Sequence, residues 1–293
     1  MIPALEYLSQ MCEYALIAEV SATPKPGLVD CHDNGAHTDM CHDTFIASTH
    51  AIVPYLSSMA LTGYQWDRET PSGLFAAIRP IGVKAEQAMF QATGGVNTHK
   101  GIIFSLGIIA AACGLYYRRE HCFCPEEILS LSGLLCRDVL EQDFRQIDRD
   151  NPRTHGEKLF VRYGFRGIRG EAQNGFPSIQ TCSLPAIRRL SQTCSDENPV
   201  FLNTLLTLMS QVDDTNVLAR TGRDLLAYEK SEAARILGLG GALSPEGLDA
   251  LAALNESFIQ YNISPGGCAD LLAITIFLWR MEQYGGGENE TTV

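Results

Sequence analysis

The sequence is poor in charge, and above all in positive charge. Only 19% of its 293 residues are Asp, Glu, Lys or Arg, and 34 acids against 22 bases give a formal net charge of −12 at pH 7. Because a protein that binds nucleic acid normally presents a basic face, this balance argues against a nucleic-acid partner. Any polyanionic ligand would have to be held by a few local cations, by backbone amides or by a bridging metal ion.

The sequence also lacks a secretory signal and a clear membrane span. Its first twenty residues have no basic start followed by an apolar stretch and a small-residue cleavage site, so we expect a cytoplasmic protein without a membrane partner. The most apolar run, residues 101–117, is interrupted by Ser105, Gly107 and Gly114, and we interpret it as a buried core helix. Ten irregularly spaced cysteines favour reduced core residues over a disulfide framework.

Apolar periodicity predicts an all-α fold, a single globular multi-helix domain over residues 1–293 with functional loops between the helices. Apolar residues recur at helical spacing in residues 5–15 and again in residues 45–56, and no alternating strand pattern appears. We expect roughly ten helices, with a frayed tail after about residue 285. A proline inside a helix removes a hydrogen bond, so a kink or break is expected at Pro54, Pro80 and Pro185.

The first unusual loop covers residues 19–40. Pro24 and Pro26 stiffen the backbone on both sides of Lys25 and present its single cation. Glu19 follows Cys12 by about two helical turns, which places its carboxylate on an apolar stripe, where it needs a partner or a chemical role. An ordinary proline-rich connection and a solvent-facing helix end are the simpler alternatives.

The second loop, residues 93–101, opens the most apolar helix. Glycines and backbone amides before a helix N-terminus can seat a phosphate, with His99 and Lys100 as side-chain donors. The spacing of the glycines and Lys100 in this loop does not match a P-loop. The alternative is a capped turn with Asn97 or Thr98 as the cap.

The third loop covers residues 154–177. Thr154 and Glu157 have the spacing of a capping box. After them, four glycines alternate with Arg166, Arg169 and Glu171, a pattern that lets the backbone approach a ligand while guanidinium groups hold phosphate oxygens. A flexible surface loop is the alternative.

Two further loops place carboxylates at helix starts. Asp213, Asp214 and Asn216 offer hard oxygen ligands of the kind that Mg²⁺ prefers, although the same residues are common helix caps. Asp270 shares a helix face with Ile274 and predicts an inward-pointing carboxylate, with a favourable position near the helix N-terminus as its alternative.

One group of potential zinc ligands is misleading. Several histidines and cysteines fall within twelve residues, but their spacing matches no common zinc site, and we treat the group as incidental. Its members are Cys31, His32, His37, Cys41 and His42.

Seven ordered motifs carry a resemblance that covers nearly the whole chain. They are Pro-Lys-Pro-Gly-Leu-Val-Asp, Asn-Gly-Ala-His-x-Asp-Met, Arg-Pro-Ile-Gly, Gly-Val-Asn-Thr-His-Lys-Gly, Gly-x-Arg-Gly-Glu-Ala, Asp-Thr-Asn-Val and Ser-Pro-Gly-Gly-x-Ala-Asp-Leu-Leu. In this order they resemble the triphosphoribosyl-dephospho-CoA synthase family. The resemblance implies ATP and 3′-dephospho-CoA as substrates: the 2′-hydroxyl of dephospho-CoA displaces adenine from C1 of the ATP ribose, with inversion. The product is the prosthetic-group precursor for the acyl carrier subunit of citrate lyase or malonate decarboxylase, and a downstream enzyme then transfers the prosthetic group.

This chemistry suggests a role for each residue named above. We predict Glu171 or Glu19 as the base, and His99 or His37 as the group that helps to protonate adenine. The predicted Mg²⁺ ligands are Asp30, Asp39, Asp214 and Asp270. The residues predicted to bind ATP or dephospho-CoA are Lys25, Gly27, Asn97, Lys100, Arg169, Asn216, Gly266 and Gly267.

Two other functions use similar parts. An all-α, Mg²⁺-dependent hydrolase of ADP-ribosyl bonds would also need inward carboxylates, with water as the nucleophile. A non-catalytic nucleotide-binding assembly factor would bind ATP without releasing adenine.

Overall fold

The described chain is built of helices alone. The computed structural model describes residues 2–68 and 70–285, and within these ranges it contains thirteen α-helices, one π-helical turn, one 3₁₀ turn and no strand, which confirms the predicted all-α fold. The α-helices are α1 (Pro3–Ser21), α2 (His42–Tyr64), α3 (Ser72–Ala92), α4 (Lys100–Glu120), α5 (Pro125–Arg145), α6 (His155–Tyr163), α7 (Gly167–Gln173), α8 (Leu184–Thr193), α9 (Glu197–Gln211), α10 (Thr215–Thr221), α11 (Arg223–Gly238), α12 (Pro245–Tyr261) and α13 (Gly266–Met281).

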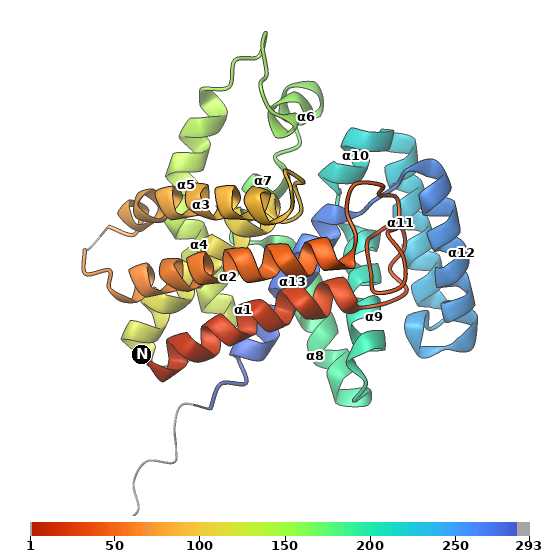
Figure 1. Cartoon of the computed structure of the whole chain (residues 1–293), viewed down its shortest axis with the longest axis horizontal. Helices are drawn as coiled ribbons and strands as arrows, with labels where there is room; N and C mark the ends of the chain where they lie inside the picture. Colours follow the sequence, from red (N-terminus) through yellow and green to blue (C-terminus); the bar gives the residue numbers. More distant parts are fainter. Residues whose placement is uncertain (1, 69, 286–293) are drawn as a thin grey trace, which may run out of the picture.

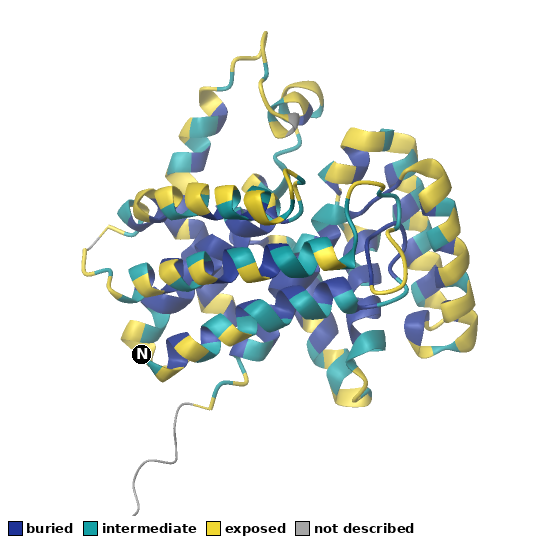
Figure 2. Cartoon of the chain, viewed as in Figure 1, coloured by how far each residue is buried: buried dark blue, intermediate teal, exposed yellow. Residues whose placement is uncertain are grey.

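Two buried helices organise the packing. Helices α1 to α5 lie on one side of the molecule and α8 to α12 on the other, with α13 running between them (Figure 1). Every residue of α13 from Leu271 to Trp279 is buried, and α4 is buried almost continuously from Ile102 to Leu115. The buried core therefore follows α4 and α13, whereas exposed residues gather on the outer helices such as α12 (Figure 2). The orientation of these two helices is set by hydrophobic burial along their whole length.

The apolar run predicted as a core helix is α4. Among the described helices it alone is long and apolar enough to cross a membrane, but 72% of its most apolar window is buried inside the protein. This burial confirms the predicted core helix.

Side-chain caps begin α6 and α12. Ser244 caps α12 by accepting a hydrogen bond from the amide of Gly247, and Thr154 and Glu157 form the predicted capping box of α6. A kink or break was expected at Pro54 and Pro80, and the structure excludes a break, because α2 and α3 continue through these prolines. Helix packing on both sides of each proline outweighs the one lost hydrogen bond. Pro185 instead stands at the start of α8, directly after the π-helical turn η1 (Ile179–Ser183).

The cysteines follow the prediction only in part. All ten are free thiols, and Cys12, Cys113, Cys136 and Cys268 are buried, but Cys31 and Cys122 are exposed. The predicted frayed tail after Gly285 lies outside the described residues.

Glycines let α2 and α4 pack with their backbones in contact. A Cβ atom at Gly63 would collide with the carbonyl oxygen of Ala111, and one at Gly114 would collide with that of Ala60. Both obstacles are backbone atoms, so relief would require the two helices to move apart.

We expect Gly63→Ala or Gly114→Ala to lower the free energy of unfolding by about 1–3 kcal/mol, because overpacking at this crossing forces the backbones apart. Urea denaturation measures the change. The control is Gly238→Ala in α11, where a new Cβ meets no atom within 4 Å. Equal stability of all three variants would contradict the close α2–α4 contact.

Candidate functional site

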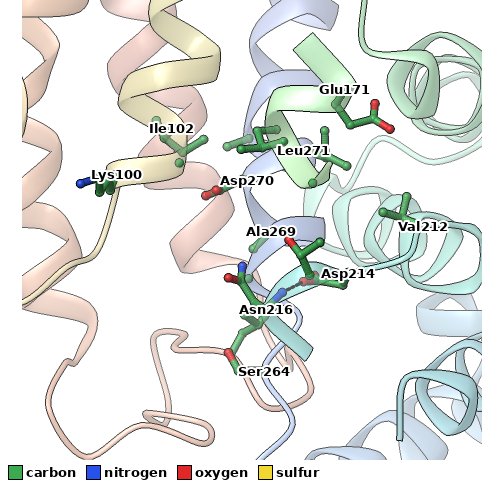
Figure 3. A pocket seen from close by; sticks show the side chains of 18 of the residues that line it. Lys100, Ile102, Glu171, Val212, Asp214, Asn216, Ser264, Ala269, Asp270 and Leu271 are labelled. Carbon is green, nitrogen blue, oxygen red and sulfur yellow. Dashed lines mark hydrogen bonds between the residues drawn. The ribbon is translucent and has the colours of Figure 1, made fainter. Parts of the chain in front are cut away.

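A cavity of about 840 Å³ lies where the first turns of four helices meet the loop that follows α1. Residues at the starts of α4, α7, α10 and α13 line it, as do Glu19 and Lys25 (Figure 3). Helix N-termini carry partial positive charge and unpaired amides, which favours anionic ligands. The cavity thus brings together most of the predicted site residues, although they come from loops distant in sequence.

Lys25 and Glu19 form a buried ion pair in the cavity wall. The Lys25 Nζ atom lies 2.5 Å from Glu19 Oε1, and the two residues are 1% and 6% exposed. Glu19 is on the inward stripe of α1, as its spacing predicted. Its carboxylate is already committed to an ammonium group, so Glu19 is a poorer candidate base than Glu171.

His99 is a neutral imidazole at the cavity. Burial, with a smaller contribution from the nearby Lys25 ammonium, lowers the pKa of His99 to about 3. The Thr98 hydroxyl donates to Ser48 Oγ over 2.7 Å, and Ser48 Oγ lies 2.7 Å from His99 Nδ1. When Ser48 donates its hydroxyl proton to Nδ1, the imidazole proton is on Nε2. His99 can therefore donate an N–H, but it is not an imidazolium acid near neutral pH.

His37 is held by two neighbours. Its Nε2 lies 2.8 Å from Ser264 Oγ and its Nδ1 lies 3.3 Å from an Arg220 nitrogen. Burial and the Arg220 charge lower the pKa of His37. Both ring nitrogens are engaged, so His99 has the freer donor.

Asp270 points from α13 toward the first turn of α4 (Figure 3). A Cβ atom at Gly101 would overlap its Oδ2, so the glycine permits this approach. Burial raises the pKa of Asp270 well above its usual range, with further contributions from the Glu19 and Asp214 charges. Within the described chain no hydrogen bond to this carboxylate is found, and its lone pairs face the cavity.

Glu171 is the second carboxyl with a raised pKa at the cavity. Burial raises the pKa, while Ser178 opposes the shift by donating from Oγ to Oε1 over 2.7 Å and from its amide to Oε2 over 3.1 Å. Glu171 is thus held in place by one residue and remains available to a substrate.

Asp214 caps two helices at once. Its Oδ1 accepts from the amides of Asn216 and Val217 at 2.7 and 3.4 Å, and its Oδ2 accepts from the amide of Cys268 at 2.8 Å. The carboxylate therefore joins the starts of α10 and α13. This is the helix-cap alternative to the predicted metal role.

The remaining predicted ligand-binding residues at the cavity lie at helix N-termini. Asn97 accepts from the amide of Lys100 at 3.3 Å and so helps to begin α4, and Lys100 pairs with Glu86 at 3.0 Å. Asn216, Gly266 and Gly267 also line the cavity, at the first turns of α10 and α13.

Four predicted site residues lie away from the cavity lining. Arg169 is exposed and borders a smaller pocket with Asp143, whereas Arg166, the N-cap residue of α7, lines the cavity. Gly27 forms a turn with φ of 68° against Ile263. The remaining two are the exposed Asp39 and the buried Asp30, whose carboxylate accepts three backbone amides of its own loop.

The positions of the four predicted Mg²⁺ ligands show which of them could bind the ion at the cavity. The four predicted ligands are not gathered, since Asp30 and Asp39 are outside the cavity lining. Asp270 offers a carboxylate without a hydrogen-bonding partner in the described chain, and the Asn216 side chain lies on the same cavity wall. Hard oxygen atoms of this kind fit Mg²⁺ that keeps waters and phosphate oxygens as its other ligands. The Cys31–His42 group does not appear as a metal cluster within the described chain.

Sequence reasoning missed two serines that orient site residues, Ser48 and Ser178, and noted Ser264 only as the first residue of a motif. A single hydroxyl has no sequence signature, and its partner is fixed only by tertiary packing. Glu229, a buried carboxyl of α11, was missed for the same reason.

Comparison with known proteins places the chain among relatives of similar length. A family model described as ATP:dephospho-CoA triphosphoribosyl transferase matches residues 5–289. The chain belongs to this family. The 2-(5''-triphosphoribosyl)-3'-dephosphocoenzyme-A synthase of Klebsiella pneumoniae is 39% identical over 91% of this chain and 88% of its own length. A probable enzyme of the same name from Streptococcus equi subsp. zooepidemicus is 40% identical over 94% of this chain and 96% of its own length. No solved structure matches the chain.

We expect Glu19→Gln or Lys25→Met alone to cost about 3–5 kcal/mol of unfolding free energy, because each leaves a buried charge unpaired. The double variant should recover part of this loss, which a double-mutant cycle in urea measures. Glu232→Gln, which removes the exposed pair with Arg235, should cost about 0–1 kcal/mol as a control. Additive losses in the double variant would contradict the pairing.

Proposed function

We propose that this chain transfers the 5-triphosphoribosyl group of ATP to the 2′-hydroxyl of 3′-dephospho-CoA and releases adenine. The family match over residues 5–289 carries the proposal. The cavity supports it, since it is large enough for extended nucleotides and presents helix N-termini together with carboxyl groups of raised pKa.

The triphosphate survives in the product, so it serves for binding only. The first amides of α4 and α13 and the half-exposed Lys100 ammonium supply positive potential for it. A Mg²⁺ ion held by Asp270 and Asn216 would neutralise phosphate charge and orient the ribose. Binding energy from this remote group can then be used at the reacting carbon.

Adenine is the leaving group, and His99 is placed to help it leave. When the bond from ribose C1′ to adenine N9 breaks, electrons flow into the base. The Nε2–H of His99, fixed by Ser48 and Thr98, can donate a hydrogen bond to an adenine nitrogen and stabilise this charge. His99 thus assists the base by a hydrogen bond and not by transferring a proton. The proton that adenine takes up from solvent on release is balanced by the one removed from the 2′-hydroxyl.

Glu171 is the proposed base for the incoming hydroxyl. Its raised pKa makes it a stronger base than an exposed glutamate, and Ser178 holds both oxygens. Glu171 takes the 2′-hydroxyl proton as the oxygen attacks C1′ from the face opposite adenine, which gives inversion, as in glycosidases that use two groups on opposite faces.

The biological setting follows from the same proposal. The product would serve the acyl carrier subunit of citrate lyase or malonate decarboxylase after transfer by a downstream enzyme, and we place the reaction in the cytoplasm. The pathway assignment rests on the family to which the chain belongs.

We expect adenine to be released from ATP and Mg²⁺ only when 3′-dephospho-CoA is present. Liquid chromatography measures adenine, and mass spectrometry should find dephospho-CoA heavier by one triphosphoribosyl group. Acceptor-independent adenine with free ribose triphosphate would instead identify a hydrolase, and nucleotide binding without adenine would identify a binding protein.

We expect Glu171→Gln to lower kcat by about 10²–10⁴-fold while stability is kept. A base must be ionised, so turnover should fall as the pH drops through the raised pKa of Glu171. Because Ser178 lowers that pKa, Ser178→Ala should move the acid limb of the kcat profile to higher pH. Glu246→Gln, at an exposed position of α12, is the control. Near-normal turnover of Glu171→Gln would remove Glu171 from the role of base.

A further inference from the structure

Three potential metal ligands meet behind the wall of the substrate cavity. They are Asp214 at the start of α10, Glu229 of α11 and Cys268 of α13, and one ligand atom from each lies within 4.8 Å of the other two. All three residues are buried, and Glu229 and Cys268 are absent from the cavity lining. The cluster is therefore a separate place in the fold from the substrate site, with Asp214 shared between them.

Glu229 is the anomaly in this cluster. Its side chain is 0% exposed, and neither carboxyl oxygen has a hydrogen-bond partner. Burial and the nearby Asp214 charge raise the pKa of Glu229 to about 9. Buried polar groups are almost always hydrogen-bonded, so such a group needs either a proton of its own or a cation.

The other two residues have coordination capacity left. Asp214 accepts three amide hydrogen bonds, which fix the orientation of its carboxylate. It also accepts from the Cys268 thiol, whose pKa is raised by burial and by the Asp214 charge, so a bound ion would have to take the place of the thiol proton. Ligand atoms around a tetrahedral ion at ordinary bond lengths lie roughly 3.3–3.6 Å apart. The three atoms, which lie within 4.8 Å of one another, would therefore have to approach more closely around an ion.

We propose that Asp214, Glu229 and Cys268 bind a thiophilic divalent cation of the Zn²⁺ class. A thiolate beside two carboxylates suits Zn²⁺ and disfavours Mg²⁺ and Ca²⁺, which take oxygen ligands. The ion joins α10, α11 and α13 and steadies the Asp214 carboxylate that begins α10 and α13 at the cavity wall. Its role is structural, and the proposal stands independently of the transferase reaction.

Metal content of the purified full-length protein tests the proposal first. We expect one zinc ion per chain after exhaustive dialysis, and saturable rebinding of Zn²⁺ after removal with a chelator. Replacement by Co²⁺ should give a sulfur-to-cobalt charge-transfer band that Cys268→Ser abolishes. Cys136→Ser is the matched control, because Cys136 is equally buried but lies in α5, outside the cluster.

Glu229→Gln separates a metal ligand from a protonated acid. If the cluster binds zinc, this variant loses more than about tenfold in zinc affinity and its Tm no longer rises on zinc addition. If Glu229 only holds a proton, the neutral glutamine keeps or raises Tm. Absence of saturable zinc binding and of the cobalt band in the parent protein would overturn the proposal. Acceptor-dependent adenine release is scored separately, so the two proposals can fail separately.

Discussion

The burial of α4 and α13 along nearly their whole length is the constraint on which the site depends. Two helices that pack on all sides cannot rotate or slide without opening the core, so their N-termini are fixed where they meet. Both N-termini face the same cavity. A chain of net charge −12 thereby gains a place that favours anions without a basic surface.

Carboxylates contact the N-termini of the helices that line the cavity, and a glycine allows one of them to approach closely. Asp270 reaches the first turn of α4 only because Gly101 has no side chain, and Asp214 accepts amides from both α10 and α13. Each carboxylate offsets part of the positive charge of a helix N-terminus, which would otherwise attract an anionic ligand. The favourable potential and the acidic groups needed for glycosyl chemistry therefore come from the same few turns, which links the stability of the helix starts to the function of the cavity.

The sequence predicted the helices and the loops that gather at the cavity because both leave local signals: apolar spacing, caps and glycine-rich turns. It did not show which residue of a loop lines the cavity and which points away from it. Arg166 and Arg169 stand in the same glycine-rich pattern, yet only Arg166, at the N-cap of α7, lines the cavity. Asp30 reads as a free acid, but its own loop amides engage it. Pairings such as Lys25 with Glu19 depend on tertiary packing, which no local pattern encodes.

The ion pairing and protonation of the buried groups determine the net charge of the cavity wall. Lys25 is neutralised by Glu19, and His99 is kept neutral by burial, so neither adds net positive charge to the cavity wall. The positive potential that meets a triphosphate then comes from helix-start amides and from Lys100, which is more exposed than Lys25 although it pairs with Glu86. In the proposed reaction, the N–H donor of His99 is already oriented and would need little reorganisation as charge develops on adenine, which favours departure of the base.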